Sequence, residues 1–240
     1  MWIHHSKLIL FTLVADNFGF KYDENQDTQY LIKVLPEHYK AVSLDWAARL
    51  FCGIKIDWDY KNITVDIIIP GYMAKLLQIF LHTTPKRLDH QLHQHAQPQY
   101  GTNEQLTETE DKTPLLQPMD ITKLQKILRL MLYYARAVIF ALMNTLNKLA
   151  STKANVTQAT MRATKNLMNY CHTHSDSTIR YCASKKKLHI HRGASYLSES
   201  KARSRVGRHF FLSDHFNPSS PKKINSAVIV AAAHNWEAYS

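Results

Sequence analysis

The stretch Leu-Ile-Leu-Phe-Thr-Leu-Val-Ala-Asp-Asn-Phe-Gly-Phe-Lys-Tyr at residues 8–22 decides how this chain is interpreted. An apolar run leads to Asp16 and Asn17, and a second apolar run that contains Gly19 follows them. Two short runs of strand-forming residues around a turn are typical of a β-hairpin, here with a carboxylate at its bend. On its own, an Asp-Asn pair is also an ordinary turn signal, because both side chains hydrogen-bond the local backbone.

The composition is that of a globular protein. The 240 residues are 45% apolar, which is enough to build the cores of more than one compact unit. The cysteines, Cys52, Cys171 and Cys182, have no paired spacing, which favours an intracellular, reducing compartment over a disulfide framework. No apolar run approaches the roughly 20 residues that span a bilayer. We therefore expect a protein of the cytoplasm or nucleus that is neither secreted nor bound to a membrane.

Positive charge is concentrated towards the C-terminus. The formal net charge is +11, and residues 179–223 hold eleven Lys or Arg against two acidic residues. Such a block is often only a solvated face. Here the charges alternate with aromatic residues such as Tyr181, Phe210 and Phe211, a mixture that favours a folded surface facing a phosphate backbone.

Several short segments occur in an order that is typical of one family. They are Trp2-x-His4, residues 11–22, Asp57-Trp58-Asp59-Tyr60-Lys61-Asn62, Val65-Asp66, Pro70-Gly71-Tyr72, residues 132–138, residues 188–199 and residues 207–213. Together they resemble the C-terminal part of the reverse transcriptase of copia-type retrotransposon polyproteins, followed by the start of its ribonuclease H domain. The resemblance covers most of the chain, apart from a variable middle and the last dozen residues.

The resemblance implies two Mg²⁺-dependent reactions, RNA-directed DNA synthesis and cleavage of the RNA strand of hybrids. The polymerase holds two metal ions with an aspartate from an upstream strand, which would precede residue 1, and two at the hairpin tip. Asp16 stands at the first tip position, whereas Asn17 at the second brings no charge. Gly193 stands where the family has the first acidic ligand of ribonuclease H. With Asp16 as the remaining metal ligand, we expect a pseudoenzyme that does not bind Mg²⁺ productively.

The predicted fold class is α+β. It comprises a partial reverse-transcriptase palm at 1–82, a polar His/Gln-rich linker at 83–118, a helical thumb or connection segment at 119–177, and a truncated ribonuclease H-like sheet at 178–240. Apolar stripes predict helices over 121–138, 140–149 and 158–172. Asp120 is the expected cap of the first of them. The family has Asp-Pro between the first two helices, and its replacement by Ile139-Phe140 predicts fused or misaligned helices.

The expected function is weak, salt-sensitive binding of an RNA–DNA hybrid or another nucleic acid through the basic C-terminal region. The alternative is a domesticated, non-enzymatic module that binds nucleic acid or protein. A third possibility is an enzyme whose missing acids come from a partner chain. Cys171-His172-x-His174 with Cys182 has the residue types of a zinc site, but its spacing favours an ordinary helix end.

Overall fold

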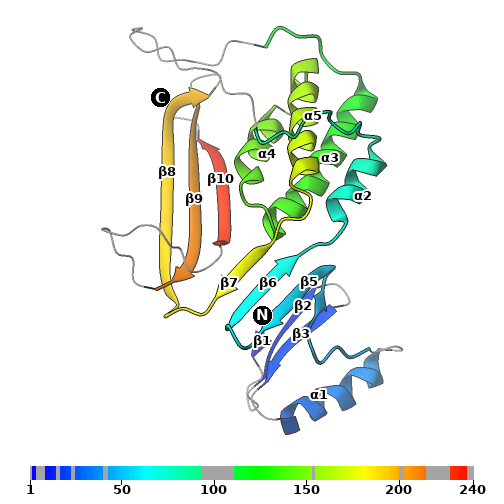
Figure 1. Ribbon diagram of the computed structural model, residues 1–240, viewed down its shortest axis with the longest axis vertical. Coiled ribbons are helices and arrows are strands. Elements are labelled where there is room, and N and C mark those ends of the chain that lie inside the picture. The colour runs from blue at the N-terminus through cyan, green and yellow to red at the C-terminus, as the bar shows by residue number, and fades with distance from the viewer. Residues whose placement is uncertain are drawn as a thin grey trace. The chain divides into compact units, whose positions relative to one another are not determined.

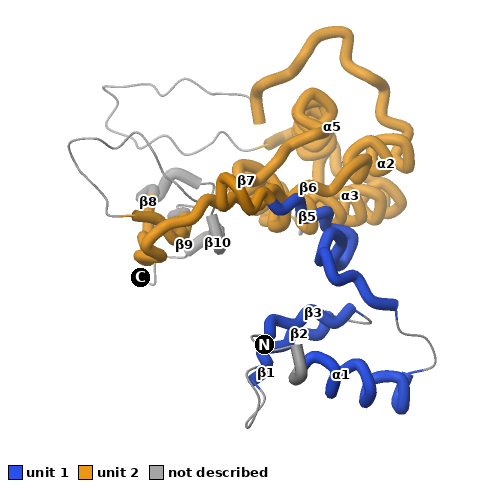
Figure 2. The backbone as a smooth tube through the Cα atoms, turned by 60° about the horizontal axis from the view of Figure 1, so that its bottom comes forward, with its two compact units in different colours: residues 1–58 blue, residues 59–240 orange. Residues whose placement is uncertain are grey.

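The computed structural model describes residues 2–3, 9–14, 17–22, 25–39, 43–92, 111–152, 155–199, 203–214 and 228–236. These residues form a mixed α+β structure with five helices and small antiparallel sheets (Figure 1). The α+β prediction is confirmed at this level. The chain divides into two compact units, residues 1–58 and residues 59–240 (Figure 2).

The first unit is built on the predicted hairpin. Its elements are β1 (Trp2–Ile3), β2 (Ile9–Val14), β3 (Asn17–Tyr22), α1 (Asn25–His38), β4 (Leu50–Phe51) and β5 (Ile54–Asp59). Strands β2 and β3 pair antiparallel from Ile9 opposite Tyr22 to Val14 opposite Asn17, as the two apolar runs on either side of the turn predict. Gly19 permits a close approach, because a Cβ there would lie 3.1 Å from the ring of Phe51.

The second unit contains a group of four helices, α2 (Tyr72–Ile79), α3 (Pro118–Ala137), α4 (Leu142–Ser151) and α5 (Gln158–Thr173). Helix α3 contacts α2 and α4, and α5 contacts the same two helices, so the four enclose one core. The core is formed by the apolar stripes that predicted the helices, with side chains such as Leu124, Met131 and Leu167 almost wholly buried.

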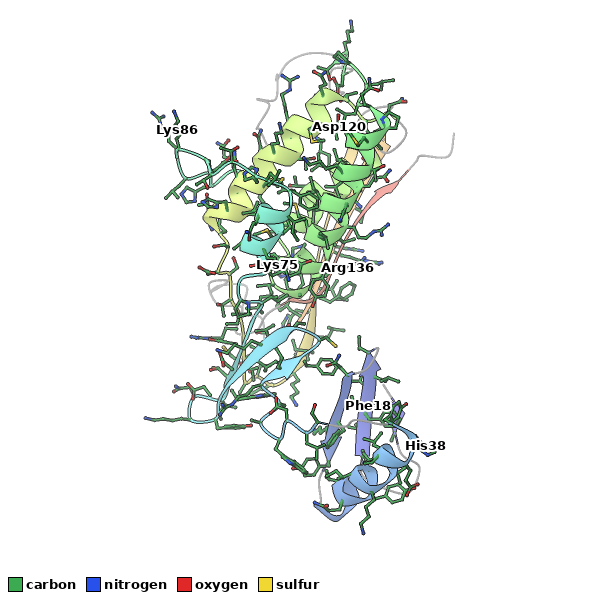
Figure 3. The ribbon with its side chains drawn as sticks, turned by 90° about the vertical axis from the view of Figure 1, so that its right-hand side faces the viewer. Phe18, His38, Lys75, Lys86, Asp120 and Arg136 are labelled. Carbon is green, nitrogen blue, oxygen red and sulfur yellow. The ribbon has the colours of Figure 1, made fainter. Side chains whose placement is uncertain are left out.

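Two details of α3 differ from the sequence prediction. The N-cap is Gln117 and Pro118 occupies the first turn, so the prediction that Asp120 caps the helix is wrong. Asp120 lies in the first turn and Arg136 in the last, near the ends of the helix dipole that their charges complement (Figure 3). Helices α3 and α4 are also not fused: α3 ends at Ala137, and burial of Ile139 beyond it fixes the turn to α4.

Both described ends of the predicted linker are hydrogen-bonded to α5. At the C-terminal end of α5, Thr173 Oγ1 accepts a hydrogen bond from the backbone N–H of Asp89 (3.0 Å), and His90 Nδ1 lies 3.2 Å from His174 Nε2. At its N-terminal end, the N–H of Gln158 donates to the carbonyl of Pro114 (2.9 Å). The residues that flank the undescribed stretch 93–110 are thus part of the helical group.

The remaining strands are β6 (Thr64–Ile68), β7 (Ile179–Cys182), β8 (Lys187–Glu199), β9 (Arg203–Ser213) and β10 (Val228–Trp236). Strands β6 and β7 pair antiparallel, and Arg180 forms a bidentate ion pair with Asp66 across them, with nitrogen–oxygen distances of 2.7 and 2.6 Å. Strands β8, β9 and β10 form a separate antiparallel sheet with β9 in the centre (Figure 1). Strands β7, β8, β9 and β10 all lie within residues 178–240, where the sequence predicts β-structure.

Candidate nucleic-acid interface

The hairpin of β8 and β9 distributes its side chains over two distinct faces. Its register pairs Leu188 with Leu212, Ile190 with Phe210, Arg192 with Arg208, and Ala194 with Val206. Directly opposed residues lie on the same face, and so do residues two apart along one strand. One face of the hairpin therefore carries Leu188, Ile190, Arg192, Arg208 and Phe210, which we call the arginine face.

The arginine face exposes apolar and cationic groups side by side. Leu188 is 61% exposed and Ile190 is 53% exposed, while both arginines are also exposed. Arg192 and Arg208 stand directly opposite each other across the hairpin. Like charges in this position repel and destabilise the pair of strands. A phosphate placed between the two guanidinium groups would remove that repulsion.

Arg208 also lies over an aromatic ring. Its Cζ is 5.7 Å from the centroid of the Phe210 ring, within the range of a cation–π contact. Among the residues that the structure describes, no carboxylate forms an ion pair with Arg192 or Arg208. The two guanidinium groups therefore keep their hydrogen-bond donors available for an external anion.

The opposite face of the hairpin, which we call the histidine face, is organised around Phe211. This side chain is only 3% exposed. The ring of His189 stacks on it at 5.3 Å, and the ring of His191 meets it edge-on at 4.9 Å. His189 Nε2 also lies 2.7 Å from the carbonyl oxygen of Asp214, to which it donates. This face is thus covered at Phe211, in contrast to the arginine face.

Further cations flank the start of β8. Lys185, Lys186 and Lys187 are exposed, and the backbone N–H of Lys185 donates to Asp214 Oδ1 at 2.9 Å. That contact fixes the lysine run beside the end of β9. The run and the arginine pair together give this hairpin a positive potential, which attracts polyanions over a distance set by the ionic strength.

Of the positions that the resemblance makes catalytic, the structure describes Asn17 and Gly193. Asp16, the proposed Mg²⁺ ligand, lies outside the described residues, and Asn17 is an exposed residue at the start of β3. Gly193 is exposed in β8 and faces Gly207 of β9. Within the part of the chain that the structure describes, no group of three or more His, Cys, Asp or Glu residues is arranged to hold a metal ion.

Gly193 is not required by the backbone at its position. Its φ lies outside the left-handed region that favours glycine, and a Cβ added there would meet no atom within 4 Å. The strand could accommodate an acidic side chain at this point. Neither packing nor backbone conformation therefore requires glycine at position 193.

Cys171, one of the residues considered for zinc, belongs to the helical core. Its side chain is wholly buried on α5, and burial raises the pKa of the thiol to about 12. A thiol with so high a pKa remains protonated at neutral pH and is a poor nucleophile and metal ligand. Cys52 and Cys182 are only partly buried.

We predict that the three cysteines differ sharply in alkylation. In the native protein at pH 8, iodoacetamide is expected to modify Cys52 and Cys182 at least about tenfold faster than Cys171, because reaction requires an accessible thiolate. Peptide mass spectrometry after timed quenching measures the three rates, and the same reaction in denaturant is the control. Equal rates in the native protein would contradict the buried position of Cys171.

No family model, no curated protein and no solved structure matches this chain. Among the described helices, none combines the length and apolar character that crossing a bilayer requires.

The sequence prediction located the basic region but missed the division into two faces. The alternation of Leu188, Ile190 and Arg192 along one strand is visible in the sequence. The residues of β9 that lie opposite them depend on the register of the two strands. A shift by one residue would place a neighbour of Arg208, and not Arg208 itself, opposite Arg192.

Proposed function

We propose that this chain is a non-catalytic relative of the copia-type reverse transcriptase and ribonuclease H, and that it binds nucleic acid, including RNA–DNA hybrids, in a salt-dependent manner. The observation that carries the proposal is the pair Arg192 and Arg208. The two arginines are exposed, directly opposed, and without an ion-pair partner among the described residues. An opposed pair of this kind costs stability unless an anion neutralises it.

A phosphate backbone is a suitable anion. Guanidinium groups bind phosphate oxygens through two parallel N–H donors, and each neutralised phosphate releases condensed counterions. The lysine run at 185–187 extends the same positive surface beyond the arginine pair. The excess of positive charge in residues 179–223 supports the same ligand class, because the lysine run, Arg192 and Arg208 within it are exposed.

The proposal excludes phosphoryl transfer by this chain alone. Two-metal chemistry requires several converging carboxylates. In the resemblance, Asn17 replaces a carboxylate of the polymerase site, and Gly193 replaces a carboxylate of the separate ribonuclease H site. Mg²⁺ is therefore not a cofactor in this proposal, and binding to nucleic acid is the end point.

We predict that the double variant Arg192→Gln/Arg208→Gln weakens binding to an RNA–DNA hybrid and flattens its salt dependence. Each lost phosphate contact lowers the slope of log K against log salt by about one, so the double variant is expected to lose about two. Fluorescence anisotropy with a labelled hybrid, titrated at several salt concentrations, measures both effects.

The matched control is Lys75→Gln/Arg136→Gln. Lys75 on α2 and Arg136 on α3 are exposed, and this variant removes the same net charge from the helical group (Figure 3). It is expected to keep most of the affinity and the slope. Equal losses in the two double variants would show that total charge, and not the arginine pair, determines binding.

A second candidate function, the domesticated module, is favoured by the packing of the helical group. Side chains from α2, α3, α4 and α5 are almost wholly buried, among them Met73, Leu142 and Leu167. A core of this kind is consistent with a chain that has lost catalytic acids and kept its fold. Thermal unfolding followed by circular dichroism tests it: a cooperative transition supports a folded module, and its absence contradicts one.

A further inference from the structure

We propose that the arginine face binds single-stranded nucleic acid, with bases stacked against Leu188, Ile190 and Phe210 and phosphates held by Arg192 and Arg208. This inference rests on the proposed function and goes beyond it in naming the preferred ligand. It predicts that a single strand binds more tightly than a duplex or a hybrid of the same length.

The composition of the face points to a ligand with an apolar surface. The side of an antiparallel sheet that faces solvent normally carries polar residues. Here the exposed side carries Leu188 and Ile190, at 61% and 53% exposure, while the histidines line the side that covers Phe211. A compact cluster of exposed apolar groups on a sheet is a feature of binding surfaces.

The apolar cluster and the cations are placed to contact the two parts of a nucleotide. The residues Leu188, Ile190 and Arg192 follow one another at every second position of β8, over about 13 Å of strand. Phe210 stands opposite Ile190, and Arg208 lies over its ring at 5.7 Å. A base stacked on this floor would leave its phosphate within the field of the arginine pair.

A duplex does not fit this face equally well. Its bases are paired and stacked on one another, so that a flat sheet meets chiefly sugars and phosphates. Only unpaired bases can be laid on an apolar floor, which is why single strands are commonly bound by sheets that present aromatic residues. Binding of a duplex here would use the arginines and leave the apolar cluster exposed to water.

The test compares three probes of equal length: fluorescein-labelled oligo(dT) of about 12 nucleotides, its duplex with oligo(dA), and its hybrid with oligo(rA). Oligo(dT) is expected to bind about tenfold more tightly than either double-stranded probe. The variant Ile190→Thr is expected to weaken binding of oligo(dT) by about tenfold and of the duplex by less than about twofold. Threonine keeps the strand propensity of the position, and Leu188→Thr is a second, independent variant.

The matched control is Ile79→Thr. Ile79 on α2 is 52% exposed, nearly the same as Ile190, and the substitution changes the same atoms. It is expected to leave the affinity for all three probes unchanged. Circular dichroism of each variant verifies that the fold is retained.

The outcomes separate this inference from the proposed function. If Ile190→Thr and Leu188→Thr leave oligo(dT) binding unchanged while the arginine double variant weakens all probes, stacking is overturned and salt-dependent binding stands. If none of these variants weakens any probe, both fail. If sedimentation shows that the wild type self-associates and that Ile190→Thr abolishes association without changing oligo(dT) affinity, the face is covered by a second copy and the inference is overturned.

Discussion

The variant Tyr134→Ala is expected to lower the free energy of unfolding of the helical group by about 3–5 kcal/mol. Tyr134 lies on α3 and is 1% exposed. Its ring stacks on that of Tyr72, with centroids 5.6 Å apart and planes 2° from parallel. Its hydroxyl donates a hydrogen bond of 2.9 Å to the carbonyl of Ser175. Alanine removes the ring, the stacking contact and the hydrogen bond together.

One further variant isolates the contribution of the hydroxyl, and a second is an exposed control. Tyr134→Phe removes only the hydroxyl and is expected to cost about 1 kcal/mol. Burial raises the pKa of Tyr134 to about 12, so the hydroxyl remains a donor throughout the neutral range. Tyr133, its neighbour in sequence, is 41% exposed, and Tyr133→Ala is expected to cost about 1 kcal/mol or less.

Urea unfolding followed by far-ultraviolet circular dichroism measures these differences. The helices provide most of the signal, and the helical group is where Tyr134 is buried. A similar loss for Tyr133→Ala and Tyr134→Ala would contradict the assignment of Tyr134 to the inside of α3 and Tyr133 to the outside.

The elements of this fold could be predicted from local patterns, because each local pattern has one physical cause. The apolar runs at 9–14 and 17–22 form the expected hairpin. The stripe that includes Leu124 and Met131 formed the expected helix. The start of that helix is predicted wrongly, since the N-cap is Gln117 and not Asp120, and Pro118 follows as the first helical residue. Proline at the first helical position is a start signal of its own.

The contacts between elements could not be predicted in the same way. The polar stretch at 83–92 has little apolar content, yet Asp89 and His90 are hydrogen-bonded to the end of α5, more than eighty residues away in sequence. Hydrogen bonds of this kind leave no periodic pattern. The arginine face likewise depends on the pairing of Arg192 with Arg208, which is set by register and not by charge content.

Like Tyr134→Ala, the variant Ile139→Asp is expected to destabilise the protein severely. It should lower the free energy of unfolding at pH 7 by about 3 kcal/mol or more. This variant introduces the acidic residue that the resemblance would place at position 139. Ile139 is only 8% exposed, between the buried Val138 and Leu142 in the turn from α3 to α4. A carboxylate at this position would lose its hydration, and among the described residues no ion pair is formed near it.

The pH dependence identifies the cause of this loss. Burial disfavours the charged form, so the pKa of the introduced carboxyl is expected to be higher in the folded protein than in the unfolded chain. The penalty relative to wild type should therefore be largest above the folded-state pKa and shrink as the pH falls below it, because the neutral acid is buried at lower cost. Ile139→Asn, which introduces a polar group without a charge, should lose stability by an amount that does not change with pH.

Met119→Asp is the exposed control: Met119 is 82% exposed in the first turn of α3, where a negative charge is favourable. A pH-independent loss for Ile139→Asp, or a similar loss for Met119→Asp, would mean that the turn between α3 and α4 is not the buried junction on which the separation of the two helices depends.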